Sequence, residues 1–392
     1  MAGPERTPDS GKIPGDLDRL GVAELFTRRL DEAFADLGCF NLAVFGKTGS
    51  GKSTLVNAIF GSEVAETGMG QPVTKGLQYH RHPGGLFGLY DSEGFETGTS
   101  GDVILDGLRR LVTDHRALPF DQQIHAVWYL VRWSDRRFEV PQESFVRALA
   151  DMGLPVIGVL SQVPQRDGVV HPQAQEFADY IEARGLPLRP AGRMVLTNAV
   201  DDPFTGGHAF GLDHLLDATY QVVPEVATAA LTAAQILDRE RKRQAARRVI
   251  HASVGIAAGV GATPIPFSDA ALLVPTQVAM IARITAAYGL PASRSKAMAA
   301  IASTVLTGGA TMAGRYLVSS LLKFVPGGAV AGSAISGAVA ATLTRAVGGA
   351  WMAVCEHVVS LPEPERGAFL AGSGPQELFT AVLRRKSSPD SR

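Results

Sequence analysis

The sequence of 392 residues has few cysteines and little charge. Its two cysteines, Cys39 and Cys355, are too few for a disulfide framework or a cysteine-based zinc site, and they suit a reducing compartment. Only 19% of the residues are charged whereas 46% are hydrophobic, which excludes disorder as the main state. Because 37 basic residues nearly balance 38 acidic ones, no overall positive field exists, and we expect no nucleic-acid partner.

Targeting and hydrolase signals are also absent. Residues 1–15 are polar and rich in proline and glycine, without the apolar core of a secretory signal, so we expect a cytoplasmic protein. Neither the HExxH pattern of zinc proteases nor the GxSxG pattern of serine hydrolases occurs. At roughly 150 residues per domain, the length predicts two or three domains.

The scarce charge is distributed unevenly. Residues 250–360 carry eight charged side chains in 111 positions, and we interpret this segment as a separate, all-α hydrophobic domain. Residues 238–248 lack turn residues and follow an Ala- and Leu-rich stretch at 226–237, which predicts one helical connector over 224–249 with a basic end at 239–248. We expect residues 1–37 to be a disordered start followed by a helix from residue 16, and residues 361–392 to be a C-terminal tail.

Residues 40–222 alternate β-branched runs with helix-compatible stretches, which predicts an α/β domain with a mainly parallel sheet. The expected strands are 41–46, 76–82, 85–91, 124–133, 155–163 and 193–198. The expected helices are 51–61, 101–115, 141–152, 172–184 and 211–221.

A complete phosphate-loop motif, GxxxxGK[ST], joins the first of these strands to the first helix. Backbone amides of such a loop, together with the helix N-terminus, bind the phosphates of a nucleotide. Lys52 is expected to contact the β- and γ-phosphates, and the Ser53 hydroxyl to bind Mg²⁺. The predicted binding residues are Gly46, Lys47, Thr48, Gly49, Ser50, Gly51, Lys52, Ser53 and Thr54.

A DxxG motif at 91–94 follows the strand 85–91, at a spacing that suits a GTPase-type domain. Asp91 is expected to hold Mg²⁺ through a water molecule, and the Gly94 amide to contact the γ-phosphate. This segment would therefore respond to hydrolysis.

Residues 53–61, STLVNAIFG, resemble the first helix of GTPases of the translation-factor-like class. Together with the phosphate loop, the segments 124–129 and 136–139 and the GLDHLL run from Gly211, they make residues 38–222 similar to Era-like and immunity-related GTPases. The resemblance implies a P-loop GTPase domain over residues 38–223 that binds GTP or GDP with Mg²⁺. It also implies that Thr74, in the segment 62–75, is the switch threonine that binds Mg²⁺ and takes part in catalysis with Lys52.

The same resemblance places base recognition after two later strands. Ser161 and Gln162 occupy the first positions of the guanine motif, but Pro164 stands where the family has its aspartate, and Asp167 could replace it only if the loop bends back. Asn198 and Ala199 occupy the last motif, where a backbone amide contacts the guanine oxygen. The choice between guanine and adenine therefore stays open.

Phe95 follows the DxxG motif, where related GTPases place the glutamine that orients the attacking water. An aromatic ring cannot orient water, so we expect slow hydrolysis unless a dimer partner or an activator supplies the missing group. The nearby polar residues Glu93, Glu96 and Thr97 are equal candidates for that role.

Residues 244–360 resemble a hydrophobic domain of unknown function that follows GTPase domains in many bacterial proteins. Phe324–Thr344 is an uncharged run of 21 residues, long enough to span a bilayer but rich in small residues. The basic run 239–248 could face anionic lipid at the inner side of the cell membrane, or it could be a solvated helix face. Membrane association and a protein-binding bundle both remain open.

We interpret the protein as a nucleotide-dependent switch, a slow GTPase whose helical domain anchors it or transmits the change. It would act through a protein effector or a nucleotide-dependent homodimer. One alternative is an adaptor that binds nucleotide without hydrolysing it, with the helical domain carrying the function. A third hypothesis is an ATP-using phosphate-loop enzyme.

Overall fold

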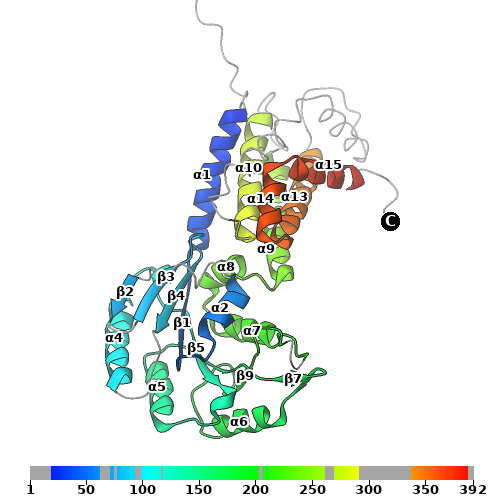
Figure 1. The fold of residues 1–392 in the computed structure, drawn as a ribbon. Coiled ribbons are helices and arrows are strands. Elements are labelled where there is room, and N and C mark those ends of the chain that lie inside the picture. The colour runs from blue at the N-terminus through cyan, green and yellow to red at the C-terminus, as the bar shows by residue number, and fades with distance from the viewer. Residues whose placement is uncertain are drawn as a thin grey trace, which may run out of the picture. The chain divides into compact units, whose positions relative to one another are not determined.

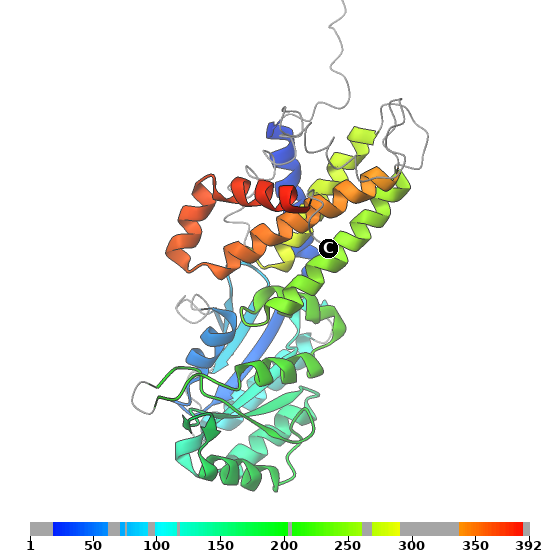
Figure 2. The ribbon, with the colours of Figure 1, turned by 90° about the vertical axis from the view of Figure 1, so that its right-hand side faces the viewer.

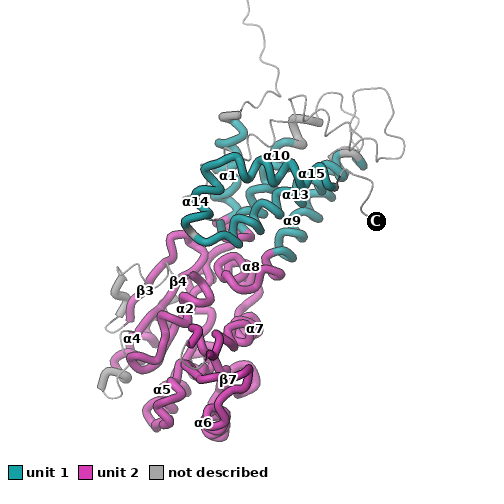
Figure 3. Tube along the Cα trace, turned by 45° about the vertical axis from the view of Figure 1, so that its right-hand side comes forward, with its two compact units in different colours: residues 1–33, 243–286, 290–392 teal, residues 34–242, 287–289 magenta. Residues whose placement is uncertain are grey.

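The computed structural model describes residues 19–61, 71–74, 77–92, 99–115, 118–202, 206–260, 269–290 and 337–386. The chain divides into two compact units (Figure 3). One unit comprises residues 34–242 with 287–289 and contains the sheet. The other comprises residues 1–33, 243–286 and 290–392 and is helical where it is described.

The described part of the first unit forms a seven-stranded sheet in the order β2-β3-β4-β1-β5-β6-β9 (Figure 1). From β4 to β9 neighbouring strands are parallel, whereas β3 is antiparallel to both β2 and β4. Because parallel strands end at the same edge, the loops after β1, β4, β5, β6 and β9 meet there. The strands are β1 Phe40–Gly46, β2 Gln71–Thr74, β3 Leu77–Arg81, β4 Phe87–Ser92, β5 Ala126–Arg132, β6 Val156–Ser161 and β9 Met194–Leu196.

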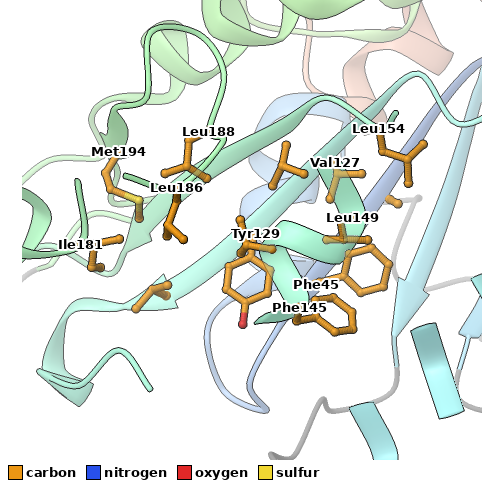
Figure 4. Close-up of a cluster of buried hydrophobic side chains, with 14 of the residues drawn as sticks. Phe45, Val127, Tyr129, Phe145, Leu149, Leu154, Ile181, Leu186, Leu188 and Met194 are labelled. Carbon is orange, nitrogen blue, oxygen red and sulfur yellow. The ribbon is translucent and has the colours of Figure 1, made fainter. Parts of the chain in front are cut away.

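Helices cover both faces of the sheet. Because side chains alternate between the faces along each strand, both faces carry apolar side chains, and helices bury each of them. The core of one face, centred on Phe45, Tyr129 and Phe145, lies under α4, α5 and α6 (Figure 4). The core of the other face, around Trp128, lies under α2, α7 and α8. These helices are α2 Lys52–Phe60, α4 Thr99–His115, α5 Val140–Asp151, α6 Pro172–Glu182, α7 Leu212–Val222 and α8 Glu225–Ala234, with short 3₁₀ turns at Phe120–Gln122 and Trp133–Asp135.

The α/β class, the mainly parallel sheet and each strand and helix expected in residues 40–222 are confirmed, with small differences at their ends. Three short strands were not predicted: β2, and the hairpin strands β7 Gln165–Arg166 and β8 Val169–Val170. Strands this short carry too little alternation to be distinguished from a loop.

The connector is two helices, so the prediction of one helix over 224–249 was wrong. Helix α8 ends at Ala234 and α9 begins at Arg239 and runs to Val260. The fully buried Gln235 holds the break, because its side chain donates to Asp238 O at 2.8 Å and accepts from Asp238 N at 2.7 Å. The Asp238 carboxylate then accepts from Arg241 N at 2.8 Å and caps α9.

The basic run 239–248 is not a free basic face, because three of its side chains have partners within the protein. Arg241 forms an ion pair with Asp217 at 2.8 Å. Arg243 forms one with Glu356 at 2.6 Å. Lys242 is 3% exposed, and its Nζ donates to Ala233 O at 2.6 Å and to a second backbone carbonyl at 3.1 Å.

Figure 2 shows the helices of the helical unit from a second side. They are organised around Trp351, which is fully buried. Its indole Nε1 donates to Thr285 Oγ1 at 3.0 Å, and its ring meets those of Phe26 and Phe379 edge to face. These contacts join α1, α10, α13 and α15. The helices are α1 Arg19–Leu37, α10 Asp269–Ala287, α13 Gly337–Ser360, α14 Glu363–Ala371 and α15 Gly374–Lys386, together with the part of α9 after residue 242.

Two helices were not predicted in the C-terminal tail. Helix α15 packs against α13, and its Phe379 and Leu383 are buried. Within the described part of the chain, no helix combines the length and the apolar character that a membrane crossing needs. Most of the uncharged run 324–344 lies outside the described residues.

We expect Trp351→Ala to destabilise the helical unit by about 3–5 kcal/mol, because it removes a buried ring on which helices from distant parts of the chain pack. Trp351→Phe keeps an aromatic ring but loses the bond to Thr285, so its effect should be smaller. Urea unfolding followed by circular dichroism measures both. An alanine variant as stable as the wild type would contradict this account of the core.

The buried Lys242 predicts a pH dependence of stability. Burial lowers the pKa of its amine from 10.5 to about 7. Between these values the unfolded chain holds a proton that the folded chain lacks, so the free energy of unfolding should rise with pH, by up to about 1.4 kcal/mol per unit from this group. Below pH 7 both the folded and the unfolded chain hold this proton, so the free energy of unfolding no longer changes with pH through Lys242.

Lys242→Met tests this pH dependence, since methionine fills a similar volume and does not titrate. Urea unfolding of both proteins at pH 6.5, 7.5 and 8.5 should give a steeper rise for the wild type. Parallel pH profiles for the two proteins would show that Lys242 does not titrate in this range.

Candidate nucleotide-binding site

The phosphate loop runs from Gly46 at the end of β1 to Lys52 at the start of α2. Gly46 has φ +149°, and a Cβ there would lie 2.6 Å from Leu130 O, so only glycine fits. Gly51 has φ +86° and gives α2 no side-chain cap. The N-terminal amides of α2 and its positive dipole end therefore suit an anion.

The side chain of Lys52 folds back over the phosphate loop and binds the backbone of that loop. Its Nζ donates to Gly46 O at 3.0 Å and to Lys47 O at 3.4 Å. Burial lowers the pKa of this amine, while the negative charge of Asp91 opposes that shift. Asp91 is half-buried near the end of β4 and pairs in register with Val44 of β1. The acidic Asp91 and the basic Lys52 therefore lie at the same edge of the sheet.

The donor groups of the loop fit a phosphate and Mg²⁺. The buried Ser50 hydroxyl has no hydrogen-bond partner among the described residues, and an oxygen acceptor would satisfy it. Ser53 and Thr48 are exposed and can reach a ligand. No cluster of three or more acidic, histidine or cysteine side chains occurs in the described ranges. Mg²⁺ in nucleotide sites needs only one or two protein ligands in addition to phosphates.

The end of β6 holds the phosphate loop in place. Ser161 Oγ donates to Ser50 O at 2.7 Å, and Gln162 Nε2 donates to Gly49 O at 2.8 Å. Gln162 has φ +56°, an uncommon conformation for a residue with a side chain, and this turn directs it at the loop. Both residues were predicted to bind the nucleotide as part of the guanine motif, a role that stays a prediction. In the structure their side chains bind the backbone of the phosphate loop.

A pocket of about 300 Å³ lies beside this contact. Gln162, Pro164 and Gln165 line it from the loop after β6, and Asn198, Ala199 and Asp202 from the loop after β9. Main-chain bonds join the two loops, because Val163 N donates to Thr197 O at 3.0 Å and Thr197 N donates to Leu160 O at 2.8 Å. The base-binding residues predicted from the two later motifs thus share one pocket with the phosphate loop.

Two further charged contacts border the loop and were not predicted. Lys47 Nζ lies 3.1 Å from Glu139 Oε2, and Glu139 also caps α5. Arg132, at the end of β5, binds Asp135 at 2.7 Å. Its guanidinium would lie 3.8 Å from a Cβ on Gly49. Both contacts arise where parallel strands end beside the loop, so sequence spacing alone does not reveal them.

Some predicted residues fall where the structure describes little or nothing. The main chain of Thr74 ends β2 and pairs with Leu77, but its side chain is not described. Gly94 and Phe95 lie outside the described residues, as do Glu93, Glu96 and Thr97. The roles assigned to all of them stay predictions.

Asp167 does not bend back to the base site. It lies at the exposed turn of the β7–β8 hairpin, with φ +52°, and does not line the pocket. The hairpin is closed by the paired strands Gln165–Arg166 and Val169–Val170, which keeps the turn away from the end of β6. Pro164 does line the pocket, but its side chain offers no hydrogen-bond acceptor.

Two family models match the chain. Residues 41–161 match the family described as 50S ribosome-binding GTPase, and residues 226–371 match a domain of unknown function, DUF697. The first segment is a GTPase domain. The two domain types that the sequence resembled, a GTPase domain followed by a C-terminal domain of unknown function, are confirmed. No curated protein matches the chain.

Three solved structures match part of this chain. A probable GTP-binding protein engB is 16% identical with a TM-score of 0.32, over 46% of this chain and 97% of that one. Aquifex aeolicus Era bound to GDP and aluminium fluoride is 17% identical with a TM-score of 0.32, over 48% and 58%. The bacterial selenocysteine-specific elongation factor EF-Sec is 16% identical with a TM-score of 0.29, over 47% and 28%. Values this low carry no functional conclusion for this chain.

We expect Gly46→Ala to destabilise the nucleotide-free GTPase domain by about 1–3 kcal/mol, because the new methyl group would overlap Leu130 O. Gly49→Ala is the matched control, since Gly49 also has a positive φ but no atom within 3.4 Å of its Cβ position. Urea unfolding of the two variants and the wild type measures the difference. Equal losses would show that conformation, and not crowding, requires glycine at position 46.

Proposed function

We propose that the protein is a nucleotide-dependent switch that binds GTP and GDP with Mg²⁺ and hydrolyses GTP slowly. The observation that carries this proposal is the arrangement of Lys52 and Asp91 at the carboxyl ends of the adjacent strands β1 and β4. Lys52 would exchange the loop carbonyls for the β- and γ-phosphate oxygens. Its charge would then stabilise the negative charge on the transferred phosphoryl group.

The metal ion would be held by few protein groups. Ser53 at the start of α2 and Thr74 at the end of β2 would bind Mg²⁺ directly, and Asp91 through a water molecule. Mg²⁺ would supply charge neutralisation of the phosphates. Ser53 is exposed and Asp91 is half-buried, so both side chains are accessible to an Mg²⁺ ion that enters the site bound to a nucleotide.

The switch would act through the segments 62–75 and 92–100. Thr74 and Gly94 are the proposed contacts to the γ-phosphate, so the loss of that phosphate would release both. The far end of α2 offers a route to the connector, because Ile59 O accepts a hydrogen bond from Ile236 N at 2.9 Å. A movement of the phosphate loop would therefore reach the break between α8 and α9.

The helical domain is proposed to bind a protein effector. The internal partners of Arg241, Lys242 and Arg243 leave the basic run with less charge for anionic lipid than the sequence suggests. Attachment to the inner face of the cell membrane and a cytoplasmic location stay predictions. A nucleotide-dependent homodimer also stays a prediction, and it could supply the group that Phe95 cannot.

Lys52→Ala provides the test of nucleotide binding. Removal of a charge-assisted contact to phosphate should weaken GTP and GDP binding roughly ten- to hundredfold, and it should abolish phosphate release. Isothermal titration with GTP and with ATP measures affinity, and single-turnover phosphate release measures hydrolysis. Arg110→Ala, an exposed position on α4, is the surface-charge control and should behave as the wild type.

Each outcome of that experiment separates the hypotheses. Tight binding of GTP by the wild type with no turnover would favour the adaptor. A preference for ATP would favour the third hypothesis. Fast hydrolysis by dilute monomer would contradict the slow switch, and no binding of either nucleotide would remove every version.

A further inference from the structure

The pocket beside the phosphate loop has one charged lining residue among those that the structure describes. The phosphate loop and the start of α2 line it together with the segments after β6 and β9, and its polar side chains include the amides of Gln162, Gln165 and Asn198. The charged residue is Asp202. It lies in the loop after β9, and Pro164 after β6 lines the same pocket.

A carboxylate in a base pocket distinguishes guanine from adenine. Guanine presents two donors side by side, N1–H and the N2 amino group, and an ionised carboxylate has two acceptor oxygens and no donor. Adenine presents an acceptor at N1, which a carboxylate would repel. A site that leaves a buried polar group unpaired with the wrong ligand discriminates strongly against that ligand.

The main chain places Asp202 at the wall of the pocket. Asp202 N donates to Gly207 O at 2.7 Å, and Asp202 O accepts from Gly206 N at 2.9 Å. The neighbouring Asp201 differs, because its side chain is 71% exposed and accepts from Ala209 N at 2.8 Å. Asp201 does not line the pocket, so only one of these two adjacent acids is positioned to meet a base.

We infer that Asp202 supplies the carboxylate that selects guanine, in place of the aspartate that position 164 lacks. This inference rests on the proposed nucleotide-binding function and concerns the same pocket. The recognition chemistry thereby comes from the loop after the last strand of the sheet. Pro164 lines the same pocket, and its side chain offers no acceptor.

Asp202→Asn tests the inference by a change of specificity. Asparagine offers one donor and one acceptor, which match the C2 oxygen and N1–H of xanthine. Relative to the wild type, the full-length variant should bind GDP roughly ten- to hundredfold more weakly and xanthosine diphosphate more tightly. Competition against a fluorescent GDP derivative, with GDP, xanthosine diphosphate and ADP, measures all three affinities.

Asp201→Asn is the matched control and should keep the wild-type preference for GDP. The main-chain bonds of Asp202 do not depend on its carboxylate, so the asparagine variant should fold, and thermal unfolding of both variants checks this. GDP binding that is unchanged in Asp202→Asn, or weakened with no gain for xanthosine diphosphate, would overturn the role of Asp202 and leave the proposed function standing. A wild type that binds no nucleotide would instead refute the proposed function.

Discussion

The phosphate loop keeps its shape because side chains at the end of β6, two strands away from β1, bind its carbonyls. Ser161 and Gln162 donate to Ser50 O and Gly49 O, and these contacts leave the amides of the loop and of the α2 N-terminus for an anion. The contacts depend on β1, β5 and β6 being parallel and in register, since only then do the loops after β1 and β6 lie together. Sheet register is thus the condition for the site.

The same condition brings charge to one edge. Lys52 follows β1, Asp91 lies near the end of β4, and Asp202 follows β9. Each of these charged side chains lies near the point where a buried strand ends and a loop begins. The hydrophobic clusters on the two faces hold the strands rigidly, so that the loops carry chemistry and the core carries stability.

The connector shows how a basic sequence can serve structure. Lys242 is buried with two backbone carbonyls as partners, and Arg243 pairs with Glu356 more than a hundred positions along the chain. Buried or paired cations cost desolvation energy, which is recovered only by specific contacts of this kind. Gln235 and Asp238 fix where α8 ends and α9 begins, and these basic side chains add internal contacts beside that break. A count of basic residues therefore overstates the charge available to a membrane.

Local pattern by itself determined the elements and the phosphate loop. Alternation and period identify the long strands and helices, and the glycine spacing from Gly46 to Gly51 with Lys52 encodes a conformation that few other functions require. The family matches confirm the two domain types that these residues suggested. These features depend on residues that are close together in the sequence, so they can be predicted from the sequence alone.

Only the tertiary structure decided the partners of those residues. The sequence placed Gln162 in the guanine motif but did not reveal that its amide binds Gly49 O. It left Asp167 as a substitute acid, but the hairpin keeps that residue at its tip, and it did not single out Asp202. It also treated α1 and the C-terminal tail as separate from the helical domain, whereas Phe26 and Phe379 pack on Trp351. These contacts join residues far apart in the chain, and their energy depends on sheet register and helix packing, which spacing along the sequence does not record.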